Sequence, residues 1–181
     1  SSFINTDDIH SDIINMGFDF NFYGNTYNQC VLSANGYITF DLLQAGVYSP
    51  WTIGNAIPNA GQLPENAIMA PWHDIDPSVG GNVVYGTYGA APNRVFYVVW
   101  CNMPLFQCND LIVDQYVLMY EGSNKIEMHL NNKPLCAGWN GGAAVQGLVN
   151  ENSTLFEIVD DPILLQPRNF PLNWTANDEG W

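Results

Sequence analysis

The stretch GFDFNFYGNTYNQCVLSANGYITF, residues 17–40, decides the fold class of this chain. In residues 17–24, three Phe residues alternate with Asp, Asn and Tyr, which is the two-residue period of a half-buried β-strand. Residues 27–40 place Asn35-Gly36 between two apolar runs, and this dipeptide is the strongest short signal for a β-hairpin. The stretch therefore predicts consecutive antiparallel strands.

Short runs of β-branched and aromatic residues, separated by Gly, Pro and Asn, continue along the chain, and helical periodicity is almost absent. A hairpin is expected where the sequence EGSN joins two of these runs. Strands at near-regular spacing with turns between them predict an all-β fold, an antiparallel, jelly-roll-like β-sandwich. The further expected strands cover residues 94–100, 111–120, 125–131, 143–150 and 154–160.

Two segments differ from this pattern. Residues 41–66 form a long connection interrupted by Gly and Pro, and long loops are more often functional than short ones. Residues 161–181 contain three prolines, which favours an edge strand followed by an exit linker. We therefore expect a β-sandwich domain over residues 1–160, with residues 161–181 leading toward further modules.

The charge balance excludes several classes of partner. Charged residues make up only 12% of the 181 residues, and 18 acids outnumber four bases, so the formal net charge is −14. Such a surface repels phosphate backbones and anionic lipids, so no nucleic acid partner is expected. No segment approaches the roughly 18 apolar residues of a membrane span. Cations, neutral glycans and other proteins remain as partners.

The cysteines are even in number and contain no C-x-x-C motif, so zinc ligation is disfavoured. Two disulfides suit an acidic chain that is poor in Lys, and disulfides persist outside the cytoplasm. One arrangement pairs Cys101 with Cys108 across a local loop. Another pairs Cys108 with Cys136 and leaves Cys30 for Cys101. Four buried free thiols are the remaining alternative.

With the strands placed, the ordered pieces GFDFNFYGNTYNQCVLSANGYITF, AIMAPWHDIDPSVGGNVVYGTYG, NRVFYVVW, VLMYEGSNKIEMHL and WNGGAAVQGL resemble the nidogen-like type of extracellular β-domain. More closely, the sequence resembles a version found in large secreted, gliding-motility-associated surface proteins of Bacteroidota. The resemblance runs from Gly17 to Leu148. It implies an all-β domain that is displayed on the cell surface or released, often with further modules and a type IX secretion signal. It implies an adhesive or structural role and supplies no enzymatic activity.

The stretch WHDIDPS suggests a metal site. On a strand, Asp74 and Asp76 share one face, and two carboxylates at this spacing suit a hard cation such as calcium. Carbonyl groups of the Gly80-Gly81 turn would complete the shell. The alternative is that Asp76 closes the DPS turn on its own backbone while Asp74 accepts hydrogen bonds from loop amides. Zinc is disfavoured because no second His lies nearby.

Four aromatic residues in or beside turn-rich segments are candidates for ligand binding. Exposed Trp and Tyr on rigid loops stack on sugar rings or on partner surfaces. The alternative is that these rings fill the open ends of the sandwich, since large aromatic residues are usually well buried. The candidates are Tyr48, Trp51, Trp72 and Trp139.

These observations predict a non-catalytic extracellular module of a larger cell-surface or secreted protein, with an adhesion, display or scaffold role. Its expected partners are an extracellular protein or glycan, neighbouring modules of its own chain and the secretion machinery. The sequence contains no G-x-S-x-G elbow, and no spacing singles out a catalytic carboxylate pair. The alternatives are a lectin or glycan-active enzyme, and a structural spacer associated with protein export.

Overall fold

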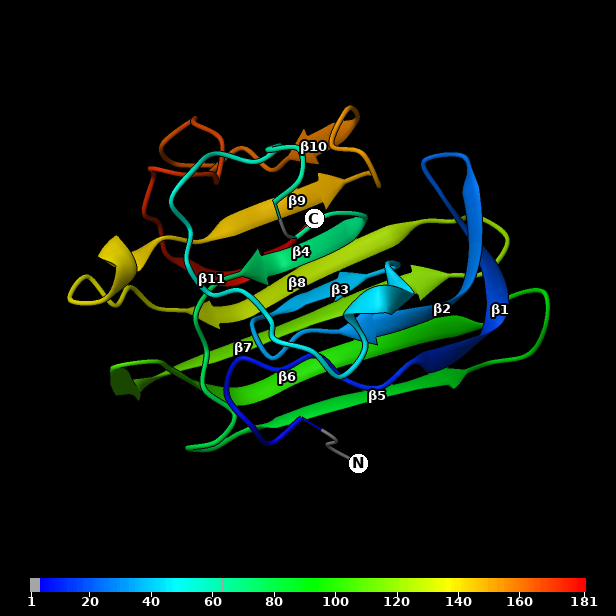
Figure 1. Cartoon of the computed structure of the whole chain (residues 1–181), viewed down its shortest axis with the longest axis horizontal. Coiled ribbons are helices and arrows are strands. Elements are labelled where there is room, and N and C mark those ends of the chain that lie inside the picture. Colours follow the sequence, from blue (N-terminus) through cyan, green and yellow to red (C-terminus); the bar gives the residue numbers. More distant parts are fainter. Residues whose placement is uncertain (1–3, 63) are drawn as a thin grey trace.

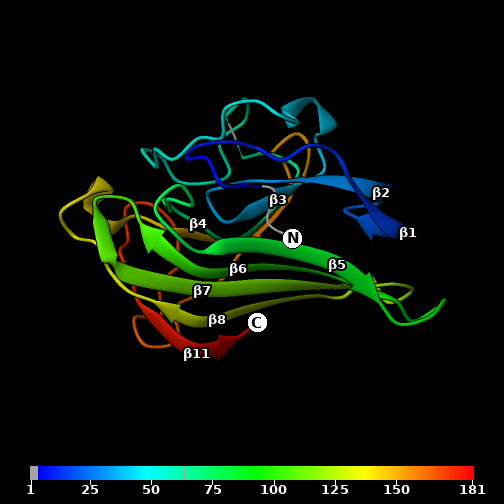
Figure 2. The ribbon, with the colours of Figure 1, turned by 90° about the horizontal axis from the view of Figure 1, so that it is seen from below.

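The computed structural model describes residues 4–62 and 64–181, and it confirms an all-β antiparallel sandwich. A six-stranded sheet packs on a five-stranded sheet, and every paired strand runs antiparallel to its neighbour. Figure 1 labels the strands, and Figure 2 shows β1, β2 and β3 in one layer and β5 to β8 with β11 in the other. Within the described residues, no helix is long and apolar enough to cross a membrane.

The elements have the following bounds. The six-stranded sheet has the order β1 (Ile14–Phe22), β2 (Asn25–Leu32), β3 (Tyr37–Thr39), β4 (Ala67–Trp72), β9 (Val145–Val149) and β10 (Phe156–Ile158). The five-stranded sheet has the order β11 (Ala176–Gly180), β8 (Ile126–Lys133), β7 (Cys108–Tyr120), β6 (Val95–Leu105) and β5 (Asn82–Tyr88). Two short 3-10 turns are η1 (Leu42–Gln44) and η2 (Asn140–Gly142).

The alternation that predicted the first strand is present in β1, where buried and exposed residues alternate along the whole strand. Its Phe side chains enter the core between the sheets, where they meet buried residues of β6 and β7 such as Phe96, Trp100 and Val117. The expected hairpin across EGSN is also present and joins β7 to β8. The period-two pattern was therefore a sound guide to the central strands.

β5 was not among the expected strands, and its burial explains why. It lies at the edge of the five-stranded sheet and pairs only with β6. Val83 is the one fully buried residue within this strand, so the sequence NVVYGTY carries no regular apolar alternation. At the opposite edge of the same sheet, β11 pairs with β8.

The Asn35-Gly36 hairpin is confirmed, but its turn is buried. Asn35 has no exposed surface, and Gly36 has a φ of +87°. A Cβ atom at Gly36 would lie 2.3 Å from the Pro71 carbonyl oxygen and 2.6 Å from Nε2 of Gln115, a buried residue of β7. Glycine is therefore required here both for its conformation and for the close approach of the two sheets.

The structure contains one disulfide, Cys108–Cys136, which joins β7 to the segment after β8. The expectation of two disulfides is wrong, because Cys30 and Cys101 are free thiols in the described part of the chain. Cys30 is buried in the core between the sheets. Cys101 follows the core residue Trp100 on β6 and therefore points to the opposite face of that strand. The two thiols thus face different sides of the five-stranded sheet.

Candidate functional site

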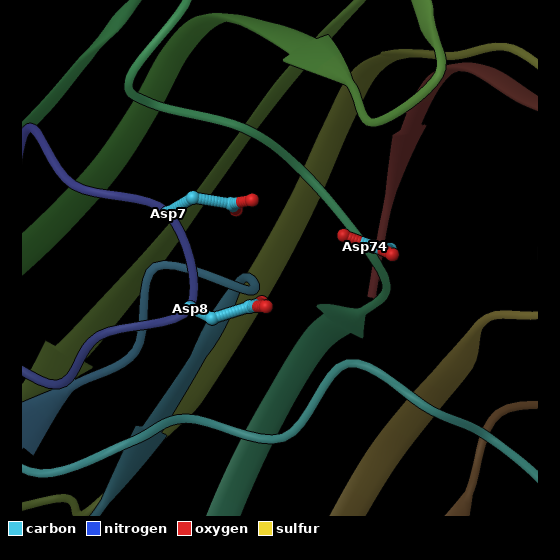
Figure 3. A group of neighbouring side chains, drawn as sticks. All are labelled: Asp7, Asp8 and Asp74. Carbon is cyan, nitrogen blue, oxygen red and sulfur yellow. The ribbon is translucent and has the colours of Figure 1, made fainter.

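Three carboxylates meet where the N-terminal segment passes the end of β4. One oxygen each of Asp7, Asp8 and Asp74 can be chosen so that all of these atoms lie within 4.8 Å of one another. Figure 3 shows the side chains of Asp7 and Asp8 extending from the N-terminal segment toward the segment that carries Asp74. We call these three residues the aspartate cluster. Its spacing and its all-oxygen chemistry fit a hard cation.

Backbone pairing fixes the N-terminal half of the cluster. The His10 amide donates to the Val47 carbonyl over 3.0 Å, and the Ser49 amide donates to the Asp8 carbonyl over 2.8 Å. Residues 8–10 therefore lie along the start of the long 41–66 connection. This pairing holds the Asp8 side chain against the buried hairpin turn.

The buried Asn35 amide connects the two halves of the cluster. Its Nδ2 donates to Oδ1 of Asp8 over 2.9 Å, and its Oδ1 accepts from the Ile75 amide over 3.2 Å. Its backbone carbonyl also accepts from the His73 amide over 3.1 Å. A single side chain thus positions Asp8 and the segment around Asp74. This explains why the turn is buried.

Asp74 and Asp7 are incompletely satisfied. Asp74 is only 7% exposed, and its Oδ2 accepts from Nε1 of Trp139 over 2.6 Å. Its Oδ1 and the Oδ1 of Asp7 are buried and have no hydrogen-bond partner. Burial, followed by the charges of neighbouring acids, raises the pKa of Asp7 to about 7. Burial likewise raises the pKa of Asp74 to about 6, against the hydrogen bond from Trp139. Both shifts show that negative charge is disfavoured here.

Asp76 does not belong to the aspartate cluster. Its Oδ1 accepts from the Ser78 amide over 2.9 Å and also from the Ser78 hydroxyl, which makes an Asx turn at DPS. The turn that the sequence offered as an alternative is therefore present. The same alternative expected Asp74 to accept hydrogen bonds from loop amides. In the structure its donor is instead the Trp139 indole. Asp76 still contributes charge, since it raises the pKa values of Asp7 and Asp8.

Two of the four aromatic candidates lie against each other beside the cluster. The ring centroids of Trp51 and Trp139 are 5.4 Å apart, and both residues are partly exposed. Phe106 packs on the other side, with its centroid 5.1 Å from that of Trp139. Nδ2 of Asn140 donates to the Trp51 carbonyl over 3.2 Å and ties the two loops together. The two indoles therefore form a fixed pair.

The other two aromatic candidates differ in exposure. Tyr48 is 57% exposed, and after desolvation the charge of Asp8 is the main cause that raises its pKa, so it lies near the aspartate cluster. Trp72 is only 3% exposed, donates from Nε1 to the Pro50 carbonyl over 2.8 Å and packs edge-on against Tyr37. Trp72 is thus a core residue. We call Tyr48, Trp51 and Trp139 the aromatic surface.

A small cavity lies behind Asp74, between His73, Lys133, Trp139 and the disulfide at Cys136. Its volume is about 20 Å³, which is room for one water molecule rather than for a sugar ring. Burial lowers the pKa of His73 to about 3, with a further contribution from Lys133. The imidazole is therefore neutral, and its Nε2 donates to Oε1 of Gln115 over 2.9 Å.

The sequence predicted Asp74 as a candidate metal ligand but did not predict that Asp7 and Asp8 lie beside it. The only sequence signal for them is the Asp pair in NTDDIH, near the N-terminus. Paired acids in a polar segment are common, and nothing local indicates which distant strand they approach. The contact depends on the Asn35 turn.

Comparison with known proteins gives one match. Residues 1–164 match the family described as NIDO related. The matched residues include every strand of both sheets except β11. No curated protein and no solved structure matches the chain. The family match agrees with the nidogen-like resemblance of residues 17–148 and spans most of the chain. The chain therefore belongs to the nidogen-related family.

Proposed function

We propose that this chain is a non-catalytic adhesion or scaffold module of a larger cell-surface or secreted protein, which binds an extracellular protein or glycan through its aromatic surface. Membership of the nidogen-related family suggests an extracellular module, and such families are generally non-enzymatic. The Cys108–Cys136 disulfide fits an oxidising compartment.

The fixed Trp51–Trp139 pair is the observation that carries this proposal. Exposed aromatic rings bind partners well when little side-chain entropy is lost on contact. The Trp139 indole is held by its hydrogen bond to Asp74, and the Trp51 ring packs against it, while the Trp51 backbone carbonyl accepts from Asn140. The exposed Tyr48 lies close to this pair, since its hydroxyl interacts with the Trp51 backbone. Together they offer stacking groups beside carboxylates, a combination that suits a sugar ring or a polar protein loop.

The cavity beside Asp74, which Asp7 and Asp8 do not line, provides no glycan-binding space between the carboxylates. A glycoside hydrolase holds its substrate between two carboxyl groups. The roughly 20 Å³ cavity beside Asp74 does not accommodate a sugar. The raised pKa values of Asp7 and Asp74 follow from burial and crowding alone. A lectin-like role thus agrees better with this end of the sandwich than a glycan-active enzyme does.

The parent proteins that we propose are the large, gliding-motility-associated proteins of Bacteroidota exported by type IX secretion. The resemblance of residues 17–148 to domains of those proteins supports this part of the proposal. In that setting, the edge strand β11, within residues 161–181, would lead on to neighbouring modules. A structural spacer for export is the rival role in the same setting.

The test is binding of the purified chain to a glycan array and to a panel of immobilised extracellular proteins. We expect saturable binding that falls at least about tenfold in Trp51→Ala and Tyr48→Ala, as for central aromatic contacts. Leu43→Ala is the matched control, because Leu43 is 87% exposed in the same 41–66 connection. Binding that is absent, or equal in all variants, would overturn the proposed surface and favour the spacer.

A further inference from the structure

Within residues 4–62 and 64–181, no Lys or Arg side chain forms an ion pair with the aspartate cluster. Among the described residues, the arginines form ion pairs elsewhere, Arg94 with Glu121 and Arg168 with Asp161 and Glu179. Lys125 pairs with Glu127. The remaining base, Lys133, donates its Nζ to the Trp174 carbonyl over 2.7 Å. Since no ion pair of the described residues offsets the cluster's negative charge, we look to an external cation or to protonation. All the ion pairs named here lie within residues 4–62 and 64–181.

Two buried oxygens in the cluster lack hydrogen-bond partners, and this is an observation separate from the proximity of the acids. Asp74 is more than nine-tenths buried, with one oxygen held by Trp139 and the other, Oδ1, without a partner. Oδ1 of Asp7 is in the same situation. Buried polar atoms are almost always satisfied, so two orphan carboxylate oxygens in one group indicate a missing ligand.

We propose that Asp7, Asp8 and Asp74 bind one calcium ion, which fastens the N-terminal segment to the end of β4. Calcium takes six to eight oxygen ligands at about 2.3–2.6 Å, so oxygens within a few ångströms of one another can share it. Water would complete the shell on the exposed side of Asp7 and Asp8, which are only partly buried. This proposal does not depend on ligand binding by the aromatic surface.

The chemistry of the ligand atoms indicates which ion the site binds. All three side chains offer hard carboxylate oxygens, which suit calcium or magnesium and disfavour zinc or copper. Magnesium demands a rigid octahedron and keeps its water, whereas loop-borne carboxylates of this kind adapt to calcium. Asp76, which the sequence offered as the partner of Asp74, is occupied by its Asx turn. The site therefore joins two distant segments.

The experiment is thermal unfolding and isothermal titration calorimetry of the chelator-treated, dialysed chain with CaCl2. We expect one ion per chain, with a dissociation constant of about 0.1–1 mM as in extracellular calcium modules. At saturating calcium the melting temperature should rise by about 5 °C. Sodium chloride at matched ionic strength should not reproduce the rise, and magnesium should give a smaller one.

The Asp7→Asn variant distinguishes an ion-binding role of the Asp7 carboxylate from a purely structural one. Without calcium, this change removes repulsion within the cluster, so the melting temperature should rise above that of the wild type. With calcium, the variant should show no further rise and no binding heat. Asp12→Asn is the matched control, because Asp12 is exposed and the change in net charge is the same. It should keep the full calcium response.

Three results would overturn the proposal. The first is a wild-type chain with neither binding heat nor a calcium-dependent melting shift. The second is an equal calcium response in Asp7→Asn and the wild type, which would indicate screening of the net charge. The third is a fall in the calcium-free melting temperature of Asp7→Asn, which would mean that this carboxylate stabilises the fold without an ion. Loss of glycan or protein binding plays no part in these readouts, so the proposed function fails or survives separately.

Discussion

In the part of the chain that the structure describes, the aspartate cluster brings three carboxylates together without a Lys or Arg partner. The C-terminal segment instead places its carboxylates around Arg168. That guanidinium has no exposed surface and donates to Asp161 over 3.0 Å, to Gln146 over 2.8 Å and to Glu179 over 3.0 Å. It also lies 4.1 Å from the ring centroid of Trp174. Each of the three guanidinium nitrogens of Arg168 therefore donates to a partner.

The pKa of Asp161 shifts in the opposite direction to that of Asp7. Burial alone would raise the pKa of Asp161, but the Leu164 and Ile163 amides and Arg168 outweigh it and lower that pKa. Burial raises the pKa of Asp7, and the neighbouring acids raise it further. The comparison shows that this fold can bury carboxylates where a basic side chain of the same chain pairs with them. In a chain with only four basic residues, Arg168 supplies that cation at the C-terminal segment, whereas among the described residues no Lys or Arg forms an ion pair with the aspartate cluster.

Removing the internal cation is expected to have the largest effect. Arg168→Met leaves Asp161 and Glu179 without their partner, so the C-terminal group comes to resemble the aspartate cluster. Breaking a buried pair by removing one member costs about 3–5 kcal/mol in free energy of unfolding. Urea unfolding in calcium-free buffer measures this loss.

Arg94→Met is the control, because Arg94 pairs with Glu121 at a position where its side chain is 30% exposed. A pair that is more accessible to solvent contributes less to the free energy of unfolding than a buried one. Equal losses in the two variants would contradict the contrast between buried and exposed pairs. A loss below about 1 kcal/mol in Arg168→Met would show that the carboxylates relax into solvent.

The second prediction concerns the covalent support of the aromatic surface. The Cys108–Cys136 disulfide closes a loop with a sequence separation of 28 and holds the segment that leads to Trp139. Cys108→Ser with Cys136→Ser should lower the free energy of unfolding by about 3 kcal/mol, mainly through the entropy of the unfolded chain. Urea unfolding measures it, and Cys101→Ser is the control, since that thiol is unpaired and partly exposed.

The same double variant should also weaken calcium binding, because Trp139 donates to Asp74. Retained stability in the double variant would mean that the loop is already ordered in the unfolded ensemble. Retained calcium affinity with reduced stability would show that the aspartate cluster does not depend on Trp139. Each result therefore identifies which contacts of this end of the sandwich are coupled.

The sequence was sufficient to predict the sandwich, because alternation in residues 17–24 and the Asn35-Gly36 turn are local signals. It was insufficient for the aspartate cluster, because Asp7 and Asp8 reach Asp74 only through the folded hairpin turn. Cysteine number could not predict pairing for the same reason: the face on which Cys101 lies follows from strand register. Local patterns thus predicted strands, while contacts between distant segments required the fold.

The smallest expected effect is a pH dependence at the C-terminal segment. Lys133 is 2% exposed, and burial, with a contribution from Arg168, lowers its pKa from 10.5 to about 7. The charge of Lys133 also helps to lower the pKa of the neutral His73. Below pH 7 both the folded and the unfolded chain carry the proton. Between pH 7 and 10.5 only the unfolded chain carries it, so the free energy of unfolding rises with pH.

The measurement is urea unfolding of the wild type and Lys133→Met at pH 8 and pH 9, above the raised pKa values of Asp7 and Asp74. The wild type should gain about 1 kcal/mol more than the variant across this interval, because it differs by nearly one proton between its two states. Equal pH dependence in both proteins would mean that Lys133 remains charged in the folded state. The segment around Arg168 would then hold two buried cations, and its excess of positive charge would make the contrast with the aspartate cluster sharper.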